Sequence, residues 1–360
     1  MKNYKITLFY DWLNQWGGAE KVLLDLIKLY PQAPVYTLVH DPKKTSWIPK
    51  NTKIITSFIN KFPFSKKNPI FYTPFYSLAL RQFNFSKYDI VISTTQVSGH
   101  SLKVLKPTLF VCYLHNINRY VYQTPNQFKI LKPFLNIYKK IDFKFGQMPD
   151  FLFCNSKTVQ KRIKNNYQRN AKVINPGIDI SFFAPSNKKS NQKYFLIVSR
   201  LVNHKRIDIA IKACQKLNLE LKIVGTGRDK KNLKKIIKPK SKIEFVGKVN
   251  NKKLLNIYQN CQALICPQLE DFGLTAIEAQ SCGKPVIAYQ RGGLTETVIN
   301  NKTGVFFKNQ TVKSLVSAIK NFDSKNFSKI NCRKNAMKFS NQNFMLNFKK
   351  EVDFICQNHQ

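Results

Sequence analysis

Two of the four acidic residues in the least basic stretch of this sequence are placed where they could bind a ligand. The 360-residue chain carries 60 Lys and Arg against 19 Asp and Glu, a formal net charge of +41, yet residues 251–300 hold four basic and four acidic residues. Within that stretch, Glu270 lies in a predicted loop, and Glu278 follows in an apolar helical pattern between Ile277 and Ala279. Carboxylates at these two places could accept hydrogen bonds from hydroxyl groups of two different sugar rings.

The segment between the two glutamates predicts a loop that opens a helix. It reads Phe272, Gly273, Leu274 and Thr275. Backbone N–H groups at the start of a helix have no partner inside the helix, and the helix dipole favours an anion there. We therefore expect a phosphate group of a ligand to contact this segment.

Two cations follow a predicted buried strand at residues 194–198, namely Arg200 and Lys205. Fixed positive charges at the end of a strand suit a diphosphate, and they would stabilise it as a leaving group. Taken alone, ordinary surface charge is the simpler explanation in a chain with 60 basic residues.

Gly17 and Gly18 lie between a predicted strand and a predicted helix. Glycine lets the backbone approach a ligand closely, and the helix start offers N–H groups to an anion. The full GxGxxG dinucleotide fingerprint is absent, and turn geometry alone accounts for a glycine pair about as well. His115 ends a predicted strand at residues 110–114, where ligands of parallel sheets bind, although a lone histidine is more often structural.

Apolar, strand-like runs alternate with helical patterns along the whole chain. They lie at residues 5–10, 35–39, 53–56, 89–93, 109–114 and 151–154, and again at residues 194–198, 219–224, 242–246, 263–266, 285–288 and 304–307. This alternation predicts parallel sheets with helices on both faces.

Turn-forming and polar residues at 181–192 predict a linker between two domains. We therefore expect an α/β protein with two doubly wound, Rossmann-like domains that face each other across a cleft. The predicted domains are residues 1–183 and 190–340. A predicted C-terminal helix, residues 341–360, is expected to pack back towards the first domain.

Eight cysteines are scattered through the chain without a CxxC pair. The sequence therefore predicts buried free thiols in the reducing cytosol, and neither a zinc site nor a redox motif. The apolar run at the N-terminus stops at Asp11, which is too short for the core of a signal peptide. Since no apolar stretch reaches the ~18 residues of a spanning helix, we expect a soluble or peripheral protein.

Lysines and aromatic residues alternate in two segments, residues 61–76 and 128–145, and residues 51–180 carry 20 basic and four acidic residues. A basic amphipathic surface suits an anionic membrane. For each segment alone, a core-facing aromatic stripe with a solvated lysine face is the simpler interpretation. A nucleic-acid-binding protein is the competing interpretation of the net charge, but the sequence lacks the usual nucleic-acid-binding motifs.

The chain resembles glycosyltransferase family 4, a retaining family with the GT-B fold, over roughly its full length. The resemblance rests on an ordered set of motifs: Gly17-Gly18-Ala19-Glu20, Pro176-Gly177-Ile178-Asp179, Arg200 with Lys205 and Asp208, Gly225-Thr226-Gly227, the pair Glu270 and Glu278, and Gly292-Gly293. Residues 113–120 resemble the mannosyltransferase-like branch that builds O-antigen and related polysaccharides. They read Leu-His-Asn-Ile where such proteins often have Cys-His-Thr-Pro.

The resemblance implies a role for each matching residue. Arg200 and Lys205 would neutralise the donor diphosphate, Glu270 would hold hydroxyls of the transferred sugar, and Glu278 would hold the ribose. His115 would contact the transferred sugar near its reacting carbon. We therefore predict His115, Arg200, Lys205 and Glu270 as catalytic residues. The other predicted donor contacts are Gly17 and Gly18 at the phosphates, Val246 beside the base, and Phe272, Gly273, Leu274 and Thr275 along the sugar and phosphate.

The implied activity is retaining transfer of a hexose, with mannose as one candidate, from a GDP- or UDP-linked sugar to a glycan or lipid-linked acceptor. It would serve cell-surface polysaccharide synthesis without metal or cofactor, in the cytoplasm at the inner face of the plasma membrane. The expected partners are the nucleotide-sugar, the lipid-linked acceptor and an anionic membrane, and no nucleic acid. Three alternatives stay open: a nucleic-acid or polyanion-binding protein, a GT-B nucleotide-sugar epimerase, and a membrane-surface scaffold with a decayed site.

Overall fold

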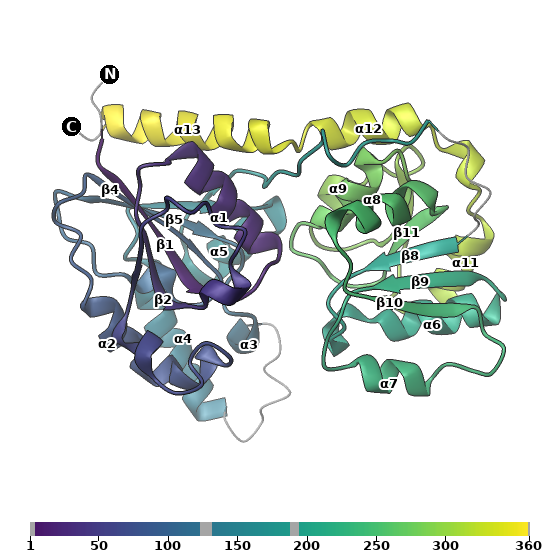
Figure 1. Ribbon diagram of the computed structural model, residues 1–360, viewed down its shortest axis with the longest axis horizontal. Coiled ribbons are helices and arrows are strands. Elements are labelled where there is room, and N and C mark those ends of the chain that lie inside the picture. Colours follow the sequence, from purple (N-terminus) through teal and green to yellow (C-terminus); the bar gives the residue numbers. More distant parts are fainter. Residues whose placement is uncertain (1–3, 123–131, 188–193, 359–360) are drawn as a thin grey trace. The chain divides into compact units, whose positions relative to one another are not determined.

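The computed structural model describes residues 4–122, 132–187 and 194–358, and it divides into two compact units (Figure 1). The first unit comprises residues 1–175 and 345–360, and the second comprises residues 176–344. Each unit is built around its own parallel sheet. The prediction of two Rossmann-like α/β domains is confirmed.

The first unit has a seven-stranded sheet in the order β3-β2-β1-β4-β5-β6-β7, with every pair of neighbours parallel. Leu8 of β1 lies between Val35 of β2 and Ile92 of β4, which fixes the register at the centre of the sheet. The strands are β1 (Ile6–Leu13), β2 (Val35–His40), β3 (Ile54–Thr56), β4 (Ile90–Thr95), β5 (Leu109–Leu114), β6 (Phe151–Cys154) and β7 (Lys172–Val173). The helices that belong to this sheet are α1 (Gly18–Leu29), α2 (Tyr76–Arg81), α3 (Arg119–Tyr122), α4 (Lys132–Gly146) and α5 (Lys157–Tyr167).

Alternate residues of the central strands pack on opposite faces of this sheet, as a pleated strand requires. Cys112 and Cys154 join a core with Val159 and Ile163 of α5. On the other face, the ring of Phe348 packs against Tyr113 and Phe153. The two faces are therefore covered by different helices, which makes the sheet doubly wound.

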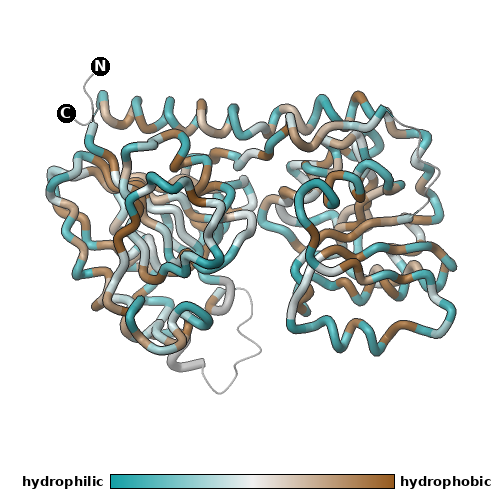
Figure 2. The backbone as a smooth tube through the Cα atoms, in the orientation of Figure 1, coloured by the Kyte–Doolittle hydropathy of each residue, from teal (hydrophilic) through white to brown (hydrophobic). Residues whose placement is uncertain are grey.

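The second unit has a six-stranded sheet in the order β10-β9-β8-β11-β12-β13, again with parallel neighbours. Its strands are β8 (Tyr194–Val198), β9 (Glu220–Val224), β10 (Ile243–Gly247), β11 (Ala263–Cys266), β12 (Val286–Tyr289) and β13 (Gly304–Phe307). Its helices are α6 (Ile207–Lys216), α7 (Lys230–Lys235), α8 (Asn251–Asn260), α9 (Leu274–Ser281), α10 (Leu294–Thr297), α11 (Val312–Lys320) and α12 (Lys329–Met337), and α13 (Asn341–Asn358) begins here. Figure 2 shows hydrophobic residues concentrated along these strands.

Two hydrophobic cores flank the second sheet. One contains Leu196 and Leu264 together with residues of α8, α9 and α12. The other contains Phe195 and Ile265 together with residues of α6 and α11. All eight cysteines of the chain are free and buried, and burial raises the pKa of the Cys214 thiol, for example, to about 12. The prediction of buried free thiols is confirmed.

The boundary between the units lies at Asn175/Pro176, earlier than the predicted end of the first domain at residue 183. The difference arises because the segment after Pro176 packs into the second core. Ile178 pairs with Ser340 in a parallel bridge, and Phe183 is buried, with Arg333 Nη1 donating to its carbonyl at 2.6 Å. Of the predicted linker at residues 181–192, residues 188–192 lie outside the described residues.

Helix α13 crosses from one unit to the other, since the second boundary lies at Phe344/Met345 within it. From Met345 onward the helix packs on the first unit. Glu351 forms an ion pair with Lys172 at 2.6 Å, and the carbonyl of Cys356 accepts a hydrogen bond from Tyr4 at 3.4 Å.

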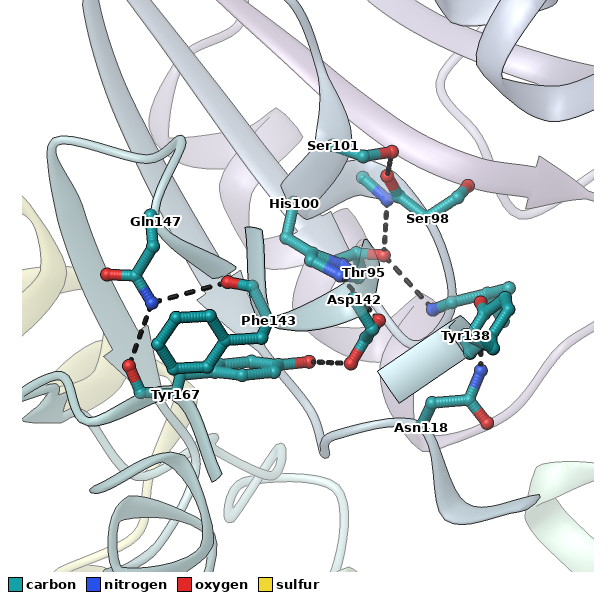
Figure 3. A network of polar contacts seen from close by, with 12 residues as sticks. Thr95, Ser98, His100, Ser101, Asn118, Tyr138, Asp142, Phe143, Gln147 and Tyr167 are labelled. Carbon is teal, nitrogen blue, oxygen red and sulfur yellow. Dashed lines mark hydrogen bonds and ion pairs between the residues drawn. The ribbon is translucent and has the colours of Figure 1, made fainter. Parts of the chain in front are cut away.

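A buried polar network ties α4 and α5 to the loop after β4 (Figure 3). His100 and Asp142 are both buried, with His100 Nε2 3.1 Å from Asp142 Oδ1, and the Tyr167 hydroxyl donates to Asp142 Oδ2 at 2.8 Å. Burial alone would raise the pKa of Asp142, but hydrogen bonds from His100, Tyr167 and Tyr122 and the charge of His100 lower it on balance. The ionised carboxylate is therefore stabilised by the fold.

We predict that Asp142→Ala lowers the free energy of unfolding of the first unit by about 3 kcal/mol, because it leaves buried polar partners without their acceptor. The folded-state pKa lies below the unfolded value, so this contribution is present above pH ~4 and is lost as the pH falls further. Tryptophan fluorescence during urea unfolding measures it, because all three tryptophans (Trp12, Trp16 and Trp47) belong to the first unit.

The matched control is Asp353→Ala, an exposed carboxylate that pairs with Lys349 on α13 and should change stability by less than ~0.5 kcal/mol. Equal effects of the two substitutions would contradict the role assigned to the buried network.

Candidate functional site

The second unit gathers most of the predicted site residues at one edge of its sheet. Arg200 and Lys205 follow β8, and Glu270 follows β11, the neighbouring strand. Because the carboxyl ends of parallel strands lie at the same edge, loops from separate parts of the sequence meet there. Arg200 is exposed, whereas Lys205 and Glu270 are largely buried.

Lys205 and Glu270 form an ion pair, with 2.6 Å between Lys205 Nζ and Glu270 Oε1. The same carboxylate oxygen accepts a hydrogen bond from Gln268 Nε2 at 2.8 Å. Their side chains are only 12% and 18% exposed, so the attraction is screened less than in a surface pair. The sequence predicts separate roles for these two residues, and the structure brings their charges into direct contact.

The glycine pair Gly292-Gly293 holds the Glu270 loop by close backbone contact. Gly292 has a φ of +73°, and a Cβ there would lie 2.3 Å from the Glu270 carbonyl oxygen. That carbonyl also accepts a hydrogen bond from the N–H of Gly293 at 2.8 Å. A larger residue at 292 would both strain the backbone and displace Glu270, so geometry explains this glycine pair.

Helix α9 begins directly after the Glu270 loop. Gly273 precedes its first turn with a φ of +102°, which favours glycine. The ring of Phe272 is buried and packs edge-on against Phe339, so only its backbone is placed to meet a ligand. Leu274 and Thr275 are partly exposed in the first turn, where N–H groups are available to an anion.

Glu278 lies further along α9 and is buried, 2% exposed. The Tyr258 hydroxyl of α8 donates to Glu278 Oε2 at 2.8 Å. Burial, followed by the charge of Glu278, raises the pKa of Tyr258 well above its usual value, so this hydroxyl remains a donor. Val246 lies at the carboxyl end of β10 and is partly exposed; two strands, β9 and β8, lie between β10 and β11 in the sheet.

In the first unit, Gly17 and Gly18 lie where α1 begins, just after β1. Glu20 of α1 is buried and accepts hydrogen bonds from the Tyr10 hydroxyl at 2.8 Å and from Gln15 Nε2 at 3.0 Å. A Cβ on Gly17 would lie 2.9 Å from Glu20 Oε2. Gly17 therefore leaves room for a buried carboxylate that fixes the turn.

His115 lies at the carboxyl end of β5 and is buried. Its Nε2 is 2.8 Å from Thr94 Oγ1, and its carbonyl accepts a hydrogen bond from Asn155 Nδ2 at 2.9 Å. Burial lowers the pKa of His115 to about 3, so its imidazole is neutral at pH 7. A neutral ring can exchange hydrogen bonds with a hydroxyl group without adding charge to the site.

We predict that stability falls as the pH is lowered from 6.5 towards 3, because the unfolded chain protonates His115 near pH 6.5 and the folded protein does not. Between pH 6.5 and 5 this loss is about 2 kcal/mol, and His115→Gln should remove it. Nitrogen chemical shifts of the ring, assigned with the same variant, measure the charge directly. A His115 ring that is protonated at pH 5.5 in the folded protein would refute this account.

One buried carboxylate that the sequence did not single out organises a neighbouring loop. Asp11, near the end of β1, is 2% exposed and accepts hydrogen bonds from the backbone N–H groups of four consecutive residues, Gln96, Val97, Ser98 and Gly99, at 2.7–3.1 Å. The hydroxyls of Thr95 and Ser98 also donate to it. This loop follows β4, so Asp11 fixes it at the same edge as Gly17 and His115.

Residues 4–122, 132–187 and 194–358 contain neither a candidate membrane span nor a candidate metal site. No helix within these ranges is long and apolar enough to cross a membrane. No group of three or more His, Cys, Asp or Glu side chains there could hold a metal ion.

Two family models match the chain, one in each half. The model described as Glycosyltransferase Family 4 matches residues 16–182, and the model described as Glycosyl transferases group 1 matches residues 179–339. Together with the two parallel-sheet units, these matches support a GT-B glycosyltransferase similar to family 4.

An uncharacterized glycosyltransferase of Methanocaldococcus jannaschii is 28% identical over 173 residues, which are 47% of this chain and 48% of that protein. The chain thus spans about half the length of this curated relative. Among solved structures, sucrose-phosphate synthase from Thermosynechococcus elongatus matches with a TM-score of 0.81 and 17% identity, over 98% of this chain and 100% of that one. HepE of Anabaena, in complex with UDP-glucose, matches with a TM-score of 0.76 and 19% identity, over 97% and 100%. These two likenesses establish the fold.

Proposed function

We propose that this protein is a retaining glycosyltransferase that moves a hexose from a GDP- or UDP-linked donor to a lipid-linked glycan acceptor. The observation that carries the proposal is the Lys205–Glu270 ion pair beside the start of α9, in the half that matches the group 1 glycosyltransferases. A cation for the diphosphate and a carboxylate for the sugar hydroxyls are thereby held at one place. Bound UDP-glucose in the structural relative HepE supports a nucleotide-sugar as the donor.

The reaction follows from the roles of these groups. The bond between the anomeric carbon and the donor phosphate breaks, and a bond from the acceptor oxygen to that carbon forms on the same face of the sugar. The leaving diphosphate accepts the proton of the acceptor hydroxyl. Arg200 and Lys205 stabilise the negative charge that develops on the diphosphate, so the proposal includes no metal. His115, as a neutral ring, contacts the transferred sugar.

Specificity is assigned to the remaining donor contacts. Glu278 holds the ribose, Val246 flanks the base, and Gly17 and Gly18 approach the phosphates. The resemblance of residues 113–120 to mannosyltransferases supports mannose as the first hexose to test. We place the reaction in cell-surface polysaccharide synthesis, at the cytoplasmic face of the membrane.

We predict that Glu270→Ala lowers kcat at least ~100-fold, because the transferred sugar loses a charged hydrogen-bond acceptor in the transition state. Glu220→Ala, which removes a carboxylate that is 43% exposed on β9, is the matched control and should leave turnover unchanged. Steady-state transfer assays measure both variants, and urea unfolding checks that each folds. Unchanged turnover in a folded Glu270→Ala would remove Glu270 from the site.

We predict that Arg200→Ala and Lys205→Ala each lower kcat/KM by ~100-fold, which corresponds to about 3 kcal/mol of transition-state stabilisation. Lys222→Ala serves as the control, since Lys222 lies within β9 and pairs with Glu220 of its own strand and with Glu244 of the neighbouring strand β10. Losses of equal size in all three variants would indicate a general effect of charge rather than contact with the diphosphate.

The donor is identified by thermal unfolding in the presence of a panel of GDP- and UDP-sugars, because a ligand that binds only the folded protein raises its Tm. A rise with one donor that is lost in Glu278→Ala supports the proposal and names the sugar and base. Conversion of that donor to an epimer without transfer would instead indicate an epimerase. No rise with any donor, together with salt-sensitive binding to DNA or RNA, would favour a polyanion-binding protein.

A further inference from the structure

The segment that joins β3 and α2 in the first unit carries an exposed cluster of aromatic and basic side chains. The most exposed apolar side chains are Phe64 at 73%, Ile70 at 62% and Phe71 at 76%. We call the following exposed residues the basic–aromatic platform: Lys61, Phe62, Phe64, Lys66, Lys67, Ile70, Phe71 and Phe75. Large apolar side chains that gather on a surface mark an interaction site.

The platform is held in a fixed shape by hydrogen bonds within its own segment. The buried Tyr76 hydroxyl donates to the carbonyl of Pro69 at 2.8 Å, and the Tyr72 hydroxyl donates to the carbonyl of Pro63 at 2.6 Å. Ser65 is buried between its exposed neighbours. The outward aromatic rings are thus displayed by an ordered segment, which reduces the entropy lost when they bind a partner.

Phe64 adopts a backbone conformation that bulky residues rarely accept, with a φ of +57°. Its carbonyl accepts hydrogen bonds from the N–H groups of Lys67 and Asn68, both at 2.9 Å, and these bonds maintain the turn. The fold therefore sustains local strain while exposing a phenylalanine ring to water. Such an outlier points to a function for the exposed ring.

Loops from three neighbouring strands meet at this corner. The Asn14 side chain, after β1, donates to the carbonyl of Lys66 at 3.1 Å, and Trp47, after β2, donates to the carbonyl of Gln15 at 3.2 Å. Trp16 is 41% exposed and packs against Trp47 with 5.0 Å between ring centroids. Tryptophan beside lysine is typical of proteins that lie in the headgroup region of a bilayer.

We infer that the basic–aromatic platform docks on an anionic lipid surface, with Phe64, Ile70 and Phe71 entering the headgroup region and Lys61, Lys66 and Lys67 contacting lipid phosphates. The combination of aromatic and aliphatic side chains favours lipid over nucleic acid. Nucleic-acid bases would stack on the aromatic rings, whereas an exposed aliphatic side chain such as Ile70 gains the most favourable free energy when it enters hydrocarbon. This inference rests on the proposed function and extends it, because an enzyme that acts on a lipid-linked acceptor must work at the membrane.

The test measures binding of the full chain to vesicles of phosphatidylglycerol and phosphatidylcholine by co-sedimentation, and to vesicles of phosphatidylcholine alone. We expect binding to the anionic vesicles, weakening with salt, and a blue shift of tryptophan emission. Phe64→Ser with Phe71→Ser should lower the partition coefficient at least ~10-fold. Because both side chains are largely exposed, the double variant is expected to fold, which its unfolding transition confirms.

The matched apolar control is Leu346→Ser with Phe354→Ser, two side chains of α13 that are 68% and 61% exposed. The charge test is Lys66→Glu with Lys67→Glu, expected to lower binding at least ~25-fold, since each lysine near an anionic surface is worth about five-fold. Its control is Lys161→Glu with Lys164→Glu, on exposed positions of α5. Both control pairs should retain most of the binding.

Equal losses in the platform and control variants would overturn the inference, because net charge alone would then explain binding. Equal binding to neutral vesicles, or a platform that binds RNA more tightly than vesicles, would also overturn it. Donor binding, measured by the rise in Tm, separates this test from the proposed function. Platform variants that keep donor binding but lose vesicle binding support the inference, and vesicle binding without any donor binding would refute only the proposed transfer.

Discussion

The parallel pairing of neighbouring strands is the constraint on which the rest of this structure depends. In each sheet it forces a loop from the carboxyl end of every strand to the same edge, so residues distant in sequence become neighbours. Lys205 and Glu270 meet in this way although they are 65 positions apart. In the first unit, Asp11 of β1 likewise contacts the loop at residues 96–99, which follows the neighbouring strand β4. By the same rule, the platform loop, Trp16 and Trp47 lie at one edge of the first sheet, because they follow β3, β1 and β2 respectively. Function in this fold is therefore distributed over many short loops.

Buried acidic side chains hold loops and helices in position inside a protein whose surface is strongly basic. Among the described residues, buried aspartates and glutamates occur at Asp11, Glu20, Asp25, Asp142 and Glu278, and no lysine or arginine side chain is as buried. Asp11, Glu20 and Asp142 each accept several hydrogen bonds from a loop or from a neighbouring helix. A carboxylate has room for about four hydrogen bonds, so one such group can organise a whole turn. Among the described residues, lysines and arginines are instead mostly at or near the surface, where they can meet phosphate groups.

The sequence predicted the strand–helix alternation well, because buried parallel strands such as β4 and β5 are apolar throughout. It placed the first boundary too late because Phe183 joins the second core through contacts with residues about 100–150 positions away. Helix α12 escaped prediction because its buried face includes Asn335, whose side chain donates to Gln280 and to the Thr297 carbonyl and so behaves as a core residue. The His100–Asp142 and Asp11 networks could not be found at all, since single polar residues dozens of positions apart carry no periodicity. The motifs located Lys205 and Glu270, but their direct contact required coordinates.

Because α13 completes the first unit, the part of the chain that is synthesised first is the last to finish folding. The second unit, residues 176–344, is a continuous segment, whereas the first unit needs residues from both sides of it. A growing chain therefore releases the whole second unit from the ribosome before Phe348 can cover Tyr113 of β5 and Phe153 of β6. The earlier part of the chain must wait with that apolar face uncovered, a state in which a chaperone or a premature partner could bind it.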